Sequence, residues 1–314
     1  MPLCTGRGGQ CRDRKTCRAS GRARPRHRAG HGGDRTGRRH GPHHEGPHHE
    51  GRSMMETIRI DTDARGVAHL WLARPEKHNA LSAQMIRELT RAAQALGADP
   101  AVRVVVLAAE GRSFCAGGDL GWMQEQMRAD AETRRQGARE LAMMLNALNT
   151  LPKPLIGRVQ GNAFGGGIGM ISVCDVAVAV PEARFGLTET RLGLIPATIG
   201  PYVLARMGED KARRVFMSAR LFGAEEALRL NLLASLADAE TLDAAVEAEV
   251  VPYLSCAPGA VAAAKRLARR LGSPIGEAEI EASIQALVEV WEGDEAPEGI
   301  AAFFDKRKPR WHVG

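Results

Sequence analysis

The sequence contains no apolar run of the ~18 residues that a membrane-spanning helix needs, and no apolar segment typical of a secretion signal. It also lacks Cys and His at the spacings of a zinc site. Its six cysteines form no disulfide framework, because three lie in the first 17 residues and Cys115, Cys174 and Cys256 stand in apolar or Gly-rich surroundings. These absences predict a cytoplasmic protein with reduced thiols, no metal and no membrane association.

Positive charge is concentrated near the N-terminus. Residues 1–53 carry 13 Lys and Arg against 4 Asp and Glu, whereas the rest of the chain carries 30 basic and 33 acidic residues. The first 53 residues contain no Ile, Val, Phe, Trp or Tyr and include the repeat GPHHEGPHHEG. Such a segment cannot bury enough apolar surface to offset the entropy of ordering. We therefore predict that residues 1–53 form a disordered basic tail.

The most informative stretch runs over residues 153–196. The apolar run Leu155–Val159 ends near Gly161, three glycines follow at 165–167, and an apolar segment leads to a second β-rich run at 176–180. This order predicts strand, Gly-rich turn, helix and strand. Because a Gly-rich turn before a helix presents free backbone N–H groups at the positive end of the helix dipole, it favours a negatively charged ligand.

Two common anion sites do not fit this turn. A dinucleotide site needs G-x-G-x-x-G, but Gly167 and Gly169 are followed by Ser172. A phosphate-binding loop needs Gly-Lys-Ser/Thr, which does not follow the glycines. The remaining candidate ligand is a small oxyanion such as a thioester enolate.

Four motifs occur in a fixed order: FCAGGDL at 114–120, QGNAFGGG at 160–167, Cys-Asp at 174–175 and FGLTETRLGLIPA at 185–197. Together they resemble the crotonase, or enoyl-CoA hydratase/isomerase, family, and the likeness extends over about residues 57–311. The resemblance implies an α/β fold, a superhelix of β-β-α turns. It also implies a core at 54–250 and a C-terminal helical region at 251–314 that packs against neighbouring subunits in a homotrimer or a dimer of trimers.

The same resemblance implies the residues of the site. It places two backbone N–H donors for the thioester oxygen at Gly118 and Gly166, and the catalytic carboxylate at Glu189. The ligand is an acyl-CoA thioester, so coenzyme A belongs to the substrate and no separate cofactor is expected. The implied contacts to substrate and coenzyme A are Lys77, Ala80, Leu81, Ala116, Gly117, Gly165, Arg191 and Lys306.

The chain departs from the family pattern at one position. Hydratases of the family use two glutamates around one water; the second matches Glu189, but the first would stand at Gly169. Gly169 together with the segment after Glu189 resembles hydratases of branched, carboxylated enoyl-CoAs. We therefore predict hydration of 3-methylglutaconyl-CoA, a step of leucine breakdown, with Arg191 as candidate partner of the second acid. A 3-enoyl to 2-enoyl isomerase and a general short-chain hydratase are the alternatives.

The tail has two interpretations. Its arginines are typical of nucleic-acid binding and its paired histidines of metal binding. Alternatively, Met54 and Met55 stand where a family member of ordinary length would start, and the tail is an over-extended reading frame. We favour the second interpretation, and we expect no nucleic-acid partner.

Local patterns predict several elements directly. Residues 57–72 read as a hairpin, Ser82 as the N-cap of a helix, residues 102–107 as a strand, and Asp119 as a helix cap. Residues 181–208 are predicted to form short strand-like pieces between Pro and Gly, and everything from Thr241 onward is predicted to be helical. Cys115 reads as a small buried hydrophobe, because no neighbouring group in its motif would activate a thiolate. The Met-rich segment at 120–127 fits an acyl pocket and core packing equally well.

Overall fold

The computed structural model describes residues 55–313, so the predicted tail and its interpretations lie outside the described residues. The described residues belong to one compact unit that contains a six-stranded and a four-stranded sheet. Within them, no helix has the length and apolar composition needed to cross a bilayer.

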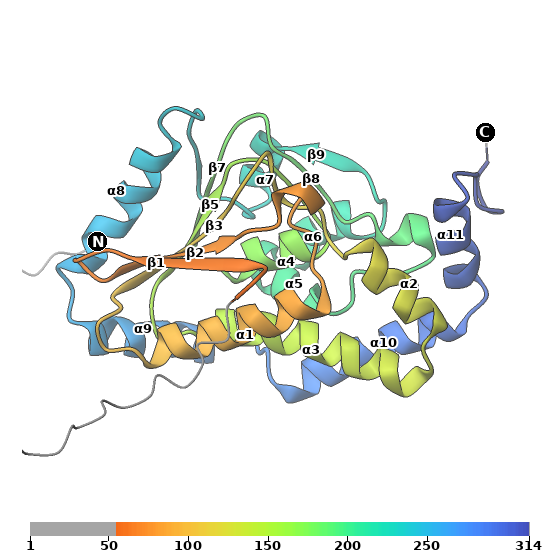
Figure 1. The fold of residues 1–314 in the computed structure, drawn as a ribbon, viewed down its shortest axis with the longest axis horizontal. Coiled ribbons are helices and arrows are strands. Elements are labelled where there is room, and N and C mark those ends of the chain that lie inside the picture. The colour runs from red at the N-terminus through yellow and green to blue at the C-terminus, as the bar shows by residue number, and fades with distance from the viewer. Residues whose placement is uncertain (1–54, 314) are drawn as a thin grey trace, which may run out of the picture. The chain divides into compact units, whose positions relative to one another are not determined.

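The six-stranded sheet forms the centre of the fold (Figure 1). It begins with the predicted hairpin of β1 (Ile58–Thr62) and β2 (Val67–Leu72), which pair antiparallel. Four parallel strands follow in the order β3 (Val104–Ala109), β5 (Leu155–Val159), β7 (Val176–Ala179) and β10 (Ser235–Leu236). Every residue of β3 is buried, as a continuous apolar run in a parallel sheet predicts.

The chain then repeats one unit three times: a strand in the large sheet, a strand in the small sheet, and a helix. The second strands of the three units are β4 (Ser113–Cys115), β6 (Asn162–Phe164) and β8 (Arg184–Gly186), which lie side by side and parallel. The helices are α2 (Leu120–Arg128), α4 (Gly166–Val173) and α5 (Gly200–Met207). This repetition confirms the predicted α/β superhelix of β-β-α turns. Strand β9 (Leu221–Gly223) closes the small sheet antiparallel to β8.

Long helices cover the sheets. Helix α1 (Ala83–Ala98) begins at Ser82, whose hydroxyl accepts a bond from the Met85 N–H at 3.2 Å, as predicted. Helix α3 (Ala131–Asn149) packs along α1. The other helical elements are η1 (Pro75–Lys77), η2 (Glu189–Leu192), α6 (Glu209–Phe216), α7 (Ala224–Arg229), α8 (Leu242–Leu254), α9 (Pro258–Leu271), α10 (Glu277–Glu292) and α11 (Glu295–Phe304).

The C-terminal helices pack against their own chain. Helix α10 lies against α3 (Figure 1), and α11 contacts η2. The predicted boundary between residues 250 and 251 falls inside α8, so these helices continue the compact unit of the core. Their role in oligomerisation stays a prediction.

One prediction of local structure is wrong. Residues 200–207 form the helix α5 rather than a strand-like piece. Pro201 lies in the first turn, where its missing N–H costs no helical hydrogen bond, and Gly208 ends the helix with a φ of 79°. Pro and Gly therefore mark the ends of a helix here, not breaks between strands.

Candidate active site

The carboxyl ends of β4, β6 and β8 meet at one edge of the small sheet, and the residues after each strand line a single pocket of about 370 Å³. Gly117 and Gly118 follow β4, Gly165 and Gly166 follow β6, and Glu189 lies shortly after β8. Ligands of α/β proteins bind beyond the carboxyl ends of parallel strands. The three β-β-α units thus bring together motifs that are far apart in the sequence.

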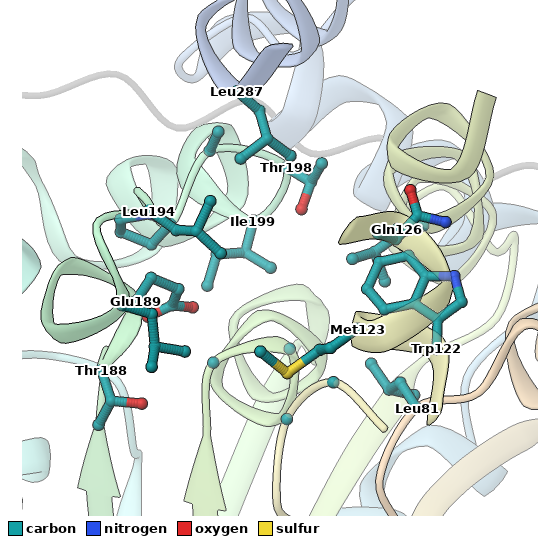
Figure 2. A pocket seen from close by; sticks show the side chains of 18 of the residues that line it. Leu81, Trp122, Met123, Gln126, Thr188, Glu189, Leu194, Thr198, Ile199 and Leu287 are labelled. Atoms are coloured by element: carbon teal, nitrogen blue, oxygen red, sulfur yellow. The ribbon is translucent and has the colours of Figure 1, made fainter. Parts of the chain in front are cut away.

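The wall of the pocket is mostly apolar (Figure 2). Helix α2 supplies Trp122 and Met123, and the C-terminal helices α10 and α11 supply Leu287, Trp291 and Phe303. Met123 therefore lines the pocket, whereas Met127 packs against the apolar cluster of Trp291, Ala296 and Ile300, so both interpretations of the segment at 120–127 hold at different positions. The C-terminal helices are part of the site of their own chain.

Two backbone N–H groups on the pocket wall have no acceptor among residues 55–313. A parallel bridge joins Leu81 to the β4 turn: the Leu81 N–H donates to the Gly117 carbonyl at 2.8 Å, and the Asp119 N–H donates to the Leu81 carbonyl at 3.0 Å. This bridge leaves the Gly118 N–H unused. Gly166 begins α4, where the helix provides no acceptor for its N–H. Both groups are available to an oxyanion.

The turn after β6 requires glycine. Gly165 has a φ of 46°, in the left-handed region, and a Cβ added there would lie 2.9 Å from Oε1 of Glu189. The carboxylate therefore lies directly against the turn that precedes α4. A side chain at Gly165 would displace it.

Glu189 is the carboxylate of this pocket. It begins η2, and its Oε2 atom is buried without a hydrogen-bond partner in the described part of the chain. Burial disfavours the charged form and raises the pKa of Glu189 from its ordinary value of 4.5 to about 7. A carboxylate with this pKa can accept and release a proton at neutral pH.

Gly169, where the family's first glutamate would stand, faces packed side chains. A Cβ at this position would lie 2.6 Å from Cγ2 of Ile199 and 3.3 Å from Cδ1 of Leu145. Ile199 itself lines the pocket. The space of a second carboxylate is therefore filled by an apolar side chain.

Sequence patterns did not indicate Arg74, which holds two segments of the site together. Its guanidinium donates to the Ala80 carbonyl at 3.0 Å and pairs with Asp119 at 3.1 Å. Asp119 also accepts a bond from the Gly121 N–H at 2.9 Å and so caps α2, as predicted. Arg74 and Asp119 are 45 residues apart, and no local pattern reveals such a pair.

Sequence analysis also missed Arg134 of α3, a cation on the pocket wall. Its Nε donates to the Gln126 carbonyl at 2.9 Å, and its guanidinium lies over the ring of Trp291, 5.2 Å from the centroid. No carboxylate within residues 55–313 forms an ion pair with it. The pocket therefore contains a positive charge that a ligand can neutralise.

The predicted contact residues divide into two groups. Leu81, Ala116, Gly117 and Gly165 line the pocket with Gly118, Gly166 and Glu189. Arg191 is exposed and does not line the pocket, and its role as partner of a second acid stays a prediction. The side chain lies on the outer side of η2, whereas Glu189 faces inward.

The remaining contacts lie outside the pocket. Lys77 and Lys306 are exposed, and their predicted place near coenzyme A stays a prediction. Ala80 is buried, its N–H donates to the Lys77 carbonyl at 3.0 Å, and its own carbonyl accepts from Arg74. The N–H groups of Ala80 and Leu81 are thus already bonded, so only their carbonyls retain capacity for a ligand.

Cys115 stands beside the glycines but is inert. Its side chain is fully buried, and burial raises the pKa of the thiol to about 12. The thiolate that a nucleophile requires does not form at neutral pH. This confirms the interpretation of Cys115 as a small buried hydrophobe.

Comparisons with known proteins agree with this geometry. A family model for enoyl-CoA hydratase/isomerase matches residues 62–313. Enoyl-CoA hydratase AFT6-1 of Alternaria alternata is 34% identical over 248 residues, covering 78% of this chain and 81% of that protein. A crystal structure of an enoyl-CoA hydratase from Mycobacterium avium has a TM-score of 0.71 at 32% identity, covering 82% of this chain and 100% of that one. The structure of Pseudomonas aeruginosa AtuE is 38% identical with a TM-score of 0.66, over 82% and 99% of the two chains.

Proposed function

The chain belongs to the enoyl-CoA hydratase/isomerase family, and from this premise we propose that it adds water to a branched, carboxylated 2-enoyl-CoA such as 3-methylglutaconyl-CoA. The family and the names of the relatives support an enzyme with enoyl-CoA hydratase activity. The observation that carries the chemistry is Glu189, a buried carboxylate with a pKa of about 7 that lines the same pocket as two unused N–H groups.

In this proposal the thioester oxygen binds to the N–H groups of Gly118 and Gly166. Glu189 takes a proton from water while the water oxygen attacks the β-carbon, and the electrons of the double bond move toward the thioester to form an enolate. Because negative charge on the thioester oxygen grows only as the enolate forms, fixed donors stabilise the transition state more than the substrate. Glu189 then returns its proton to the α-carbon, which completes the addition of water.

A second reaction fits the same groups. A lone carboxylate can also move a proton between the α- and γ-carbons of a 3-enoyl-CoA, which is double-bond isomerisation. The filled space at Gly169 favours this alternative, because no second glutamate orients a water. The unpaired Oε2 of Glu189 favours hydration, because it is free to accept a bond from that water.

The positive charge of Arg134 on the pocket wall supports a substrate with a carboxylate on its acyl chain. Arg134 replaces Arg191 as the candidate partner of a second acid, because it lines the pocket and has no ion-pair partner in the described residues. A neutral acyl chain would leave this cation without an ion-pair partner. An acidic one would neutralise it.

We also propose that the chain forms a homotrimer or a dimer of trimers. Helix α9 has no buried residue, and its Leu267 and Leu271 are exposed. An apolar helix face of this kind is stabilised when another subunit covers it. The substrate supplies coenzyme A, so no separate cofactor enters the proposal.

The test is a comparison of kcat/KM for hydration of 3-methylglutaconyl-CoA and of crotonyl-CoA, with isomerisation of a 3-enoyl-CoA measured in parallel. We expect the carboxylated thioester to be hydrated at least tenfold better than crotonyl-CoA. Faster isomerisation than either hydration would establish the alternative. A preference for crotonyl-CoA would indicate a general short-chain hydratase.

A further inference from the structure

Two polar side chains of the pocket have no hydrogen-bond partner within the described chain. Gln126 of α2 is 9% exposed and Thr198, just before α5, is 6% exposed. Neither the Gln126 amide nor the Thr198 hydroxyl forms a hydrogen bond with residues 55–313, and both residues line the pocket. Figure 2 shows Thr198 beside Leu287 and Gln126 across the pocket from Leu194.

Several other buried polar side chains of this protein are paired, although Nδ2 of Asn149 is buried without a partner in the described residues. The Ser172 hydroxyl donates to the Ile168 carbonyl at 2.8 Å, and Glu88 accepts bonds from Thr57. Buried polar groups in folded proteins are nearly always hydrogen-bonded, because an unpaired one loses its bonds to water without replacement. A polar group of a ligand in the pocket would supply the hydrogen bonds that Gln126 and Thr198 lack.

The surroundings accommodate the amide of Gln126. A Cβ added at Gly137 of α3 would lie 3.2 Å from both Nε2 and Oε1 of Gln126, so only the missing side chain leaves room for the amide. Arg134 lies one turn earlier on α3 and donates to the main-chain carbonyl of Gln126, not to its side-chain amide. Gln126 and Arg134 thus lie next to each other on the pocket wall, and Thr198 lines the same pocket.

We propose that Gln126 and Thr198 determine substrate specificity by hydrogen-bonding a carboxylate on the acyl chain, with Arg134 supplying the compensating charge. A carboxylate has two oxygens that accept several bonds, and it matches the Gln126 NH₂, the Thr198 hydroxyl and a cation together. A methyl group in its place would leave the Gln126 amide and the Thr198 hydroxyl without a hydrogen-bond partner, and Arg134 with only the main-chain carbonyls to which it already donates. This inference rests on the proposed hydration of a carboxylated enoyl-CoA and names the residues that recognise its acid.

The experiment compares 3-methylglutaconyl-CoA with 3-methylpent-2-enoyl-CoA, which has a methyl group where the first has the carboxylate. The selectivity ratio is kcat/KM for the acid divided by kcat/KM for the neutral thioester. We expect Thr198→Val and Gln126→Met, which keep side-chain size, each to lower this ratio at least tenfold. The matched control is Thr150→Val, at an exposed position outside the pocket, which should leave the ratio unchanged.

A selectivity ratio that is the same in the wild type and in both variants would overturn the inference, as would a wild-type preference for the neutral thioester. A binding measurement separates this failure from failure of the proposed reaction. The saturated thioesters 3-methylglutaryl-CoA and 3-methylvaleryl-CoA cannot be hydrated, so their Kd values report recognition alone. Tighter binding of the acid that disappears in Thr198→Val supports the inference even if hydration is absent; equal Kd values contradict it.

Discussion

Glu189 is held in a state that favours its protonated form. Burial raises its pKa from 4.5 to about 7, so the folded protein binds a proton at this position more tightly than the unfolded chain does. Stability from this group is therefore fully present below about pH 4.5 and is lost as the pH rises toward 7. Burial of Glu189 thus gives the site a carboxylate that exchanges protons near pH 7, and it lowers the stability of the folded protein near that pH.

A substitution that removes the charge should recover this stability. We expect Glu189→Gln to raise the free energy of unfolding relative to wild type by up to ~3 kcal/mol at pH 8, with a smaller difference at pH 4.5. Urea unfolding of wild type and Glu189→Gln at both pH values measures this difference in the free energy of unfolding. The control is Glu182→Gln at an exposed position. A difference between Glu189→Gln and wild type that does not grow with pH would contradict the burial of an ionisable carboxylate.

Gly169 and Ile199 form a pair that replaces the second glutamate. The Cβ of a new side chain at 169 would lie 2.6 Å from Ile199, so Gly169→Glu should first destabilise the protein, by about 1–3 kcal/mol from overpacking and more from a buried charge.

Chemical denaturation of Gly169→Glu measures this loss. Gly259→Glu is the matched control, because a Cβ at Gly259 has no atom within 4 Å. In an Ile199→Ala background the cost of Gly169→Glu should become smaller, since the clashing side chain is gone. Equal stability of Gly169→Glu and Gly259→Glu would show that the space at 169 is open.

Sequence motifs predict part of the site and miss another part for a physical reason. Glycines before a helix and a carboxylate in a fixed motif are local patterns, so Gly118, Gly166 and Glu189 could be named from the sequence. Arg74 and Arg134 have partners on other elements, and Gln126 and Thr198 reach the pocket only through the folding of α2 and α5, so no local pattern indicates any of the four. Arg191 lies outside the pocket lining although it is only two residues from Glu189, because closeness in sequence does not fix the side of a 3-10 helix on which a side chain lies.

At the scale of elements, the N-terminus of α4 supplies one of the two donors. Both Gly166→Ala and Gly166→Pro place a Cβ 2.5 Å from Leu81, but only proline removes the N–H. We expect kcat for Gly166→Pro to fall roughly 100- to 1,000-fold below that of Gly166→Ala. Steady-state kinetics of the two variants measure the difference. Similar kcat values would show that the Gly166 N–H does not stabilise the transition state.

Helices and strands could be predicted from the sequence where their apolar patterns extend over enough residues. The hairpin, α1 and α3 carry enough apolar periodicity to be recognised. Strands β4, β6 and β8 have three residues each, too few for a period, although their ends carry the site. Helix α5 was missed because Pro201 and Gly208 were interpreted as breaks rather than as the two ends of one helix.

At the scale of the molecule, the C-terminal helices complete the pocket. Helix α11 packs against η2, which carries Glu189, and Phe303 of α11 lines the pocket with Leu287 and Trp291 of α10. Oligomerisation through α9 is thus compatible with a site whose described walls come from one chain. The active site and the proposed subunit contact use different C-terminal helices.

The basic first 53 residues should be dispensable, because they carry the excess positive charge and none of the apolar pattern of the core. We expect a chain that starts at Met54 to match the full chain in Tm, and in mass by light scattering, as a trimer or a hexamer. The full-length protein is the control. A Tm lower by several degrees, or a smaller assembly, would show that these residues contribute to the fold.

The most direct test of the central claim is the pH profile of kcat/KM for hydration of 3-methylglutaconyl-CoA. Because Glu189 must be ionised to take the proton of water, we expect kcat/KM to rise with pH and to level off above about 7. In Glu189→Gln, kcat should fall by at least ~100-fold and the rise near pH 7 should disappear. A rise near pH 7 that persists in Glu189→Gln, or turnover that is unchanged in this variant, would contradict the assignment of Glu189 as the acid–base group.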